Sequence, residues 1–198
     1  MTSASPRTTE HAIAAQFIER WSPRSFTSEA IPESTLLTFF EAARWAPSAS
    51  NHQPWRFIYS LRDSESWEIF IDLLAENNRA WAQRAAALVV IVSKSTAPAR
   101  ATGIEAPSRS HAFDTGAAWA HLALQANLSG WATHGIGGFD RDKARELLKI
   151  PEQFAVQAAV AIGRRGDKAE LPAELQQREQ PNGRLPLQQI IFADRFVE

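Results

Sequence analysis

The 198-residue chain contains no cysteine, which excludes disulfide bonds, thiolate nucleophiles and cysteine-ligated metals. Its formal net charge is only −1, so charge gives no reason to expect a nucleic acid or a membrane surface as partner. No stretch approaches the roughly 20 apolar residues of a membrane span, and residues 1–7 lack the apolar run of a signal peptide. These absences favour a cytoplasmic location.

Neither an internal repeat nor a linker interrupts the sequence, so we expect one domain over residues 1–198. Residues 1–7 are predicted to be a disordered lead, and residues 186–198 form an apolar C-terminal tail. Seven tryptophans and eleven phenylalanines supply large flat side chains for a core, a subunit interface or a pocket for a flat ligand.

Hydrophobic periodicity predicts the main elements of the chain. Helices are expected from about Thr8 to Arg20, from Pro32 to Trp45, after Ser64, and from His111 to Leu128; buried strands are expected at 55–60, 87–92 and 156–163. The helix over 111–128 carries a stripe of small and apolar residues that fits close helix packing in a dimer: Ala117, Ala120, His121, Leu124 and Leu128. Residues 95–110 form a loop longer than a simple connection, and 164–181 reads as a polar surface excursion.

A loop between the second helix and the first strand is bounded by Pro47 and Pro54, which prevent either flanking element from extending into it. Ser48, Ser50, Asn51 and Gln53 offer hydrogen-bond donors and acceptors without net charge. This chemistry suits the edge of a planar polar heterocycle. The alternative is a connection whose polar side chains only satisfy their own turn.

Two further stretches are candidates for ligand binding. In the segment 20–24, Arg20 and Arg24 flank Ser22, and guanidinium groups with a hydroxyl can clamp a phosphate, although a solvated basic turn would look the same. In the segment 135–138, Gly137 and Gly138 would allow close approach of the backbone to a ligand. That segment lacks the spacing of a dinucleotide fingerprint, and it could be a plain turn before a capped helix.

In this order, the Arg-x-Ser-x-Arg segment, the Pro-Ser-x-x-Asn-x-Gln-Pro-Trp loop and the late Ile-Gly-Gly turn resemble the FMN-dependent nitroreductase family. The resemblance runs from about Phe17 to about Phe192. It implies an α+β fold with a mixed central sheet flanked by helices, in an entwined homodimer. Two FMN sites would lie at the interface, and the tail 186–198 would reach the partner subunit.

The resemblance also implies which residues bind the cofactor, and it implies no obligatory catalytic side chain and no metal. The phosphate elements and the glycine turn would come from one subunit, and the Pro47 loop largely from the other. Trp81 replaces a lysine that some family members carry, so Arg24 would supply the charge near the flavin pyrimidine. The implied FMN-binding residues are Arg20, Trp21, Ser22, Arg24, Pro47, Ser48, Ala49, Ser50, Asn51, Gln53, Asn78, Gly137, Gly138 and Arg184.

The expected activity is hydride transfer from NADH or NADPH to nitro compounds, quinones or similar electron-poor acceptors by a ping-pong mechanism. One alternative is a flavin-binding relative without general nitroreductase activity, such as a flavin-degrading, dehalogenating or carrier protein. Another is a flavin-free module that stacks its aromatic residues on single-stranded nucleic acid, which the near-zero net charge disfavours.

Overall fold

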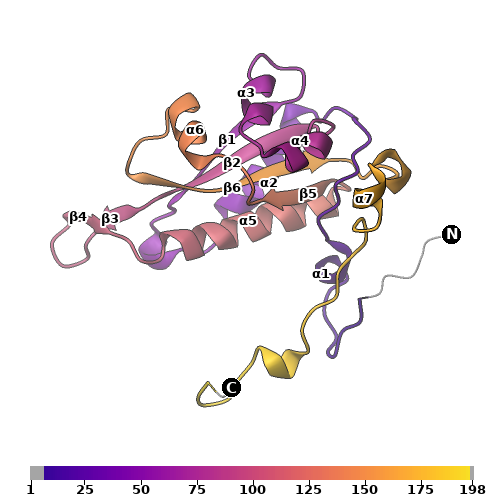
Figure 1. The fold of residues 1–198 in the computed structure, drawn as a ribbon. Coiled ribbons are helices and arrows are strands. Elements are labelled where there is room, and N and C mark those ends of the chain that lie inside the picture. The colour runs from indigo at the N-terminus through magenta and orange to yellow at the C-terminus, as the bar shows by residue number, and fades with distance from the viewer. Residues whose placement is uncertain (1–6, 197–198) are drawn as a thin grey trace.

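A four-stranded sheet in the order β1-β2-β6-β5 forms the centre of the computed structural model, which describes residues 7–196. The strands are β1 (Trp55–Leu61), β2 (Ala87–Lys94), β6 (Phe154–Gly163) and β5 (Ala132–Ile136). Every residue of β2 except Lys94 is buried, as its continuous apolar sequence predicts. A small hairpin of β3 (Thr96–Pro98) and β4 (Glu105–Pro107) projects from the end of the sheet (Figure 1).

Helices cover both faces of the sheet. Side chains along β2 alternate, so Val89 and Ile91 pack against α2 (Glu33–Arg44) and α5 (His111–Leu128). Leu88 and Val90 face the opposite cluster, to which α3 (Trp67–Asp72), α4 (Glu76–Ala82) and α6 (Arg141–Leu147) contribute. Figure 1 shows α5 running along one side of the sheet, with α3, α4 and α6 on the other.

The remaining elements are short. They are α1 (Gln16–Glu19), α7 (Ala173–Gln176) and the 3₁₀ segments η1 (Ala49–Asn51), η2 (Lys168–Glu170) and η3 (Leu187–Gln189). The C-terminal arm leaves the body of the protein beside the N-terminal segment (Figure 1). Arg7 Nε donates to the Asn182 carbonyl at 2.8 Å, and the Leu187 N–H donates to Glu10 Oε1 at 2.9 Å. These bonds tie the two ends together.

The expected α+β fold is confirmed, and the predicted helices at 32–45 and 111–128 lie where the sequence placed them. All pairings of the central sheet are antiparallel within the described residues, so the parallel pairing of a mixed sheet is not found in one chain. Neighbouring strands of this sheet run in opposite directions. A parallel pair would need a crossover connection that brings the chain back to the end of the sheet where the first strand began.

Two local predictions were wrong. The helix expected over 8–20 is reduced to α1, because Ile13 and Phe17 stay exposed and no core stabilises so short a helix. The loop expected at 95–110 contains the β3–β4 hairpin. The stripe expected on α5 is partly or fully exposed in one chain, so its expected packing in a dimer stays a prediction. The buried positions of α5 are Asp114, Thr115, Ala118, Leu122, Ala123 and Ala126.

Candidate functional site

The segment 20–24 separates two hollows of the surface. After α1 the chain becomes extended, with Arg20 at φ −69° and ψ 121°. Side chains of an extended chain alternate in direction. Arg20, Ser22 and Arg24 therefore line one cavity, Pro23 lines the other, and Trp21 borders both.

The first hollow, which we call the arginine cavity, has a volume of about 220 Å³. It brings together the expected phosphate-binding residues from both ends of the chain. Side chains that the sequence did not single out complete it. Its lining consists of Arg7, Arg20, Trp21, Ser22, Arg24, His134, Arg178, Gln180, Asn182 and Arg184.

Positive charge dominates the arginine cavity. Burial, followed by repulsion from Arg184, lowers the pKa of Arg20, and burial, followed by repulsion from Arg178, lowers the pKa of Arg24. Both side chains nevertheless stay protonated at neutral pH. Within residues 7–196 no carboxylate forms an ion pair with any of these four arginines. Guanidinium groups that converge on one cavity without ion pairs suit an anion with several oxygens.

His134 on β5 is a cavity residue that the sequence analysis missed. Its Nδ1 lies 2.9 Å from the Pro23 carbonyl oxygen, and its ring packs 4.6 Å from the Trp81 ring, centroid to centroid. Burial, assisted by Arg24 and Arg20, lowers the pKa of His134 to about 4, although the bond to Pro23 opposes the shift. The imidazole is therefore neutral at pH 7 and donates from Nδ1, which leaves Nε2 as an acceptor.

Asn78 and Gly138 meet beyond the end of β5. Asn78 Nδ2 donates to the Gly138 carbonyl at 2.9 Å, and a Cβ on Gly138 would lie 2.8 Å from that nitrogen. A Cβ on Gly137 would meet nothing within 4 Å, so the backbone there is open to a ligand. Trp81 is only 1% exposed and packs behind His134, which makes it a support of the site rather than part of its surface.

The loop from Pro47 to Gln53 lies at the other end of α5. The Ala49 N–H donates to Asp114 Oδ2 at 3.2 Å, and the Gln53 N–H donates to Ser48 Oγ at 3.0 Å. Three non-glycine residues hold left-handed backbone angles, with φ of 50° at Ser50, 56° at Asn51 and 47° at Gln53. Such strain needs support from the surrounding structure and often marks functional loops.

An apolar trough of about 500 Å³ adjoins the arginine cavity and shares Arg20 and Ser22 with it. The trough runs along α5, and its lining is Phe17, Arg20, Ser22, Trp119, Ala120, Ala123, Leu124 and Gly135. Asp114, which holds the Pro47–Gln53 loop, lies ten residues before Leu124, or about 15 Å along the helix. Within the described part of one chain, no hydrogen bond or shared cavity joins the loop to the arginine cavity.

Comparison with known proteins identifies the chain. The model of the nitroreductase family matches residues 18–80 and 59–164, which together span 18–164. The chain belongs to the nitroreductase family. An NADH dehydrogenase of Thermus thermophilus is 27% identical over 199 residues, covering 88% of this chain and 92% of that protein.

Solved structures agree with this assignment. A crystal structure described as an oxidoreductase containing FMN is 46% identical, covers 100% of this chain and 99% of its own, and superposes with a TM-score of 0.94. A putative nitroreductase from Desulfovibrio desulfuricans in complex with FMN shares the fold at 21% identity. Its TM-score is 0.71, with 96% of this chain and 100% of that chain covered.

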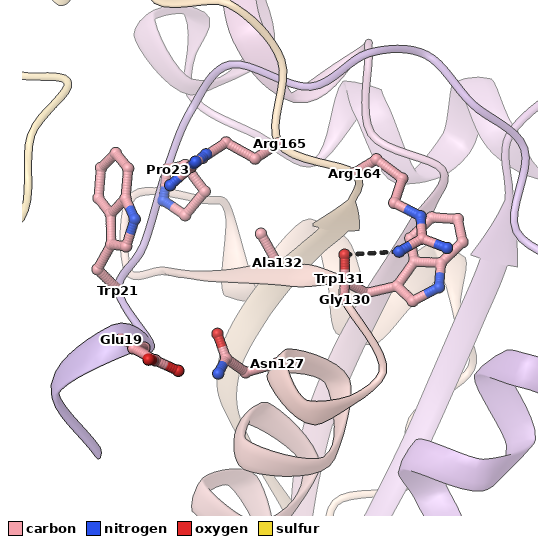
Figure 2. Close-up of a pocket in the computed structure, with 9 residues that line it drawn as sticks. All are labelled: Glu19, Trp21, Pro23, Asn127, Gly130, Trp131, Ala132, Arg164 and Arg165. Atoms are coloured by element: carbon pink, nitrogen blue, oxygen red, sulfur yellow. Dashed lines mark hydrogen bonds between the residues drawn. The ribbon is translucent and has the colours of Figure 1, made fainter. Parts of the chain in front are cut away.

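The second hollow of this nitroreductase-family chain, shown in Figure 2, has a volume of about 300 Å³ and a different character. Arg164 Nη1 donates to the Gly130 carbonyl at 2.8 Å, and its guanidinium stacks 4.5 Å from the Trp131 ring. Glu19 and Arg165 line it with opposite charges. Arg164 also forms an ion pair with Glu29 at 3.4 Å, so this hollow gathers less positive charge than the arginine cavity.

Two other classes of site were sought in residues 7–196. No group of three or more histidine, aspartate or glutamate side chains there is arranged to hold a metal ion. In the same residues, every helix is too short or too polar to cross a membrane.

Proposed function

We propose that this chain is an FMN-dependent oxidoreductase that works as a homodimer with two cofactor sites at the subunit interface. The observation that carries the proposal is the arginine cavity, whose converging guanidinium groups open directly onto an apolar trough. FMN combines a phosphate with a large flat ring, and this pair of surfaces matches both ends of such a ligand. The FMN in the 46% identical oxidoreductase supports the same cofactor here.

The residues present fit FMN in detail. Arg20, Ser22 and Arg184 would hold the phosphate, and Trp21 would border the ribityl chain. Arg24 would lie at the pyrimidine edge of the ring. The open backbone at Gly137, next to Gly138, and the Asn78 amide would meet the other polar edge of the ring.

The arrangement along α5 supports a dimer. The arginine cavity and the Pro47–Gln53 loop lie at opposite ends of this helix, so one chain holds two separated half-sites. A two-fold axis across α5 would place the loop of one subunit beside the arginine cavity of the other. Large apolar side chains on or near this face are exposed, at 83% for Phe113, 62% for Leu128 and 53% for Phe17, as expected of a face covered by a partner. The exposed C-terminal arm, with Ile190, would reach that partner.

Bound FMN would supply hydride transfer from NADH or NADPH to a nitro compound, a quinone or a similar acceptor. The protein would bind and orient the two substrates in turn, as a ping-pong cycle requires. Arg24 would stabilise negative charge that develops at the pyrimidine edge, and the backbone near Gly137 would align the ring. His134 stays neutral and would offer Nε2 as an acceptor toward the cavity. No side chain is required as a catalytic acid or base.

The proposal is tested by the visible absorption spectrum of the purified protein, recorded without oxygen before and after addition of NADH or NADPH. Flavin bands that bleach with one nucleotide are the expected result. Bands that persist would favour a flavin-binding relative without reductase activity. The absence of flavin bands, even after incubation with FMN, would contradict the proposal.

A further inference from the structure

Glu179 is a buried carboxylate behind the wall of the arginine cavity. Its flanking residues, Arg178 and Gln180, line the cavity, while Glu179 itself is 8% exposed. Its Oε1 accepts the backbone N–H groups of Arg24 at 2.8 Å and of Ser25 at 2.9 Å. Its Oε2 is buried and has no hydrogen-bond partner among residues 7–196.

This arrangement is costly. A buried carboxylate normally pairs both oxygens, and one left without a partner destabilises the fold. Capping two N–H groups does not require the charge, because a glutamine carbonyl oxygen would accept the same two bonds. The negative charge of Glu179 therefore calls for an explanation beyond local hydrogen bonding.

We infer that Glu179 is a positioning residue that sets both the shape and the electrostatic strength of the arginine cavity. Its two backbone bonds fix the chain at Arg24 and Ser25, which directs the Arg24 side chain into the cavity. Its charge lies among guanidinium groups that repel one another, and it offsets part of their positive potential. In agreement, burial and Arg178 lower the pKa of Arg24, and Glu179 partly opposes this shift.

The two roles predict opposite effects of two substitutions. Glu179→Gln keeps an acceptor for both N–H groups and removes the charge, so the cavity becomes more positive and binds a phosphate more tightly. Glu179→Ala removes the charge and the anchor, so Arg24 loses its fixed direction. A purely structural role would make both variants weaker. The inference rests on the proposed function for its ligand, FMN.

The experiment titrates FMN into apoprotein and follows the quenching of flavin fluorescence. We expect Glu179→Gln to bind FMN about threefold to tenfold more tightly than the wild type, and Glu179→Ala about tenfold more weakly. Glu174→Gln is the matched control, because it removes the same charge from an exposed position of the same segment, and it should leave the affinity unchanged. A folded Glu179→Gln variant with unchanged or weaker affinity would overturn the inference.

Two additions keep the test decisive. Glu179→Asp keeps the charge but shortens the reach to the Arg24 and Ser25 N–H groups. It should weaken binding, whereas wild-type affinity in this variant would contradict the positioning role. If wild-type protein binds no FMN, the proposed function fails, and inorganic phosphate then becomes the probe. Phosphate should raise the Tm of Glu179→Gln more than that of the wild type, and an equal rise would contradict the inference.

Discussion

The two ends of α5 carry two different regions, each proposed as half of a binding site. At one end, within the described residues, the arginine cavity gathers Arg20, Arg24, Arg178 and Arg184, none of which forms an ion pair there, so positive charge is in excess. At the other end the loop from Pro47 to Gln53 satisfies part of its own hydrogen bonding and stores strain in left-handed residues. Excess positive charge in the arginine cavity favours binding of an anionic ligand. A strained and exposed loop favours contact with another surface, such as that of a partner subunit. The difference between the two regions supports a proposed site in which one subunit supplies the cations and the other supplies the covering loop.

The largest expected effect comes from breaking the proposed contact between subunits, which would join the two half-sites. Ala120 is exposed on α5 and lines the trough. Ala120→Glu would bury an unpaired charge between subunits, at a cost of about 3 kcal/mol or more, so dimerisation should weaken by about a hundredfold. Sedimentation equilibrium measures the dissociation, and the flavin content should fall with it.

Ala80→Glu is the control for this variant, because Ala80 is exposed on α4 across the sheet from α5. It should stay dimeric and keep its flavin. A dimeric, flavin-replete Ala120→Glu variant would show that the half-sites do not meet across this helix.

The next effect concerns the arginine end. The pKa of His134 in the fold, about 4, lies below its ordinary value of 6.5, so the unfolded chain takes up the proton first as the pH falls. The stabilising effect of the neutral ring is thus complete above pH 6.5 and is lost between pH 6.5 and 4, by about 3 kcal/mol. Urea unfolding of wild type and His134→Gln at pH 7, 5 and 4 measures this. The wild type should lose more stability, and parallel losses would contradict the assignment.

Arg20→Ala tests the charge of the arginine cavity itself. Loss of a charge-assisted hydrogen bond costs about 2 kcal/mol, so the Kd for FMN should rise by about thirtyfold. Arg165→Ala is the matched control, because Arg165 lines the hollow of Figure 2 on the other side of the segment 20–24. Equal effects of the two variants in a fluorescence titration would mean that the arginine cavity is not the phosphate site.

The smallest effect concerns the loop end. Ser50 has φ of 50°, which costs a residue with a Cβ more than it costs glycine. Ser50→Gly should therefore stabilise the protein by about 0.5–1 kcal/mol in thermal unfolding. Ser50→Ala removes the hydroxyl but keeps the Cβ, and it should not be stabilised. Equal stability changes in the two variants would show that backbone strain is not the cause.

Much of the fold followed from the sequence because its core elements have clear patterns. The apolar run of β2 and the bounds of α5 needed no tertiary information. The prediction of a long N-terminal helix was wrong because Ile13 and Phe17, although spaced for one helix face, have no core to pack against and stay exposed. The expected parallel strand pairing was not found in one chain. The relative direction of paired strands depends on the connections between them, and local sequence patterns do not contain that information.

The candidate site was predictable where function imposes a local spacing. Arg20, Ser22 and Arg24 line one cavity because an extended chain alternates its side chains. The only sequence feature that pointed to His134 as a site residue was its position on the strand directly before the glycine turn, and this is weak evidence. Arg178 and Glu179 come from a segment without periodicity, and only the folded chain brings them beside Arg24.

The most direct test of the account is subunit complementation. One subunit carries Arg20→Ala, its differently tagged partner carries Asn51→Ala, and heterodimers are purified and titrated with FMN. If each site combines the arginine cavity of one subunit with the loop of the other, one site of the heterodimer is intact and binds with wild-type affinity. Heterodimers with two weakened sites and none intact would contradict the account, because each site would then belong to a single chain.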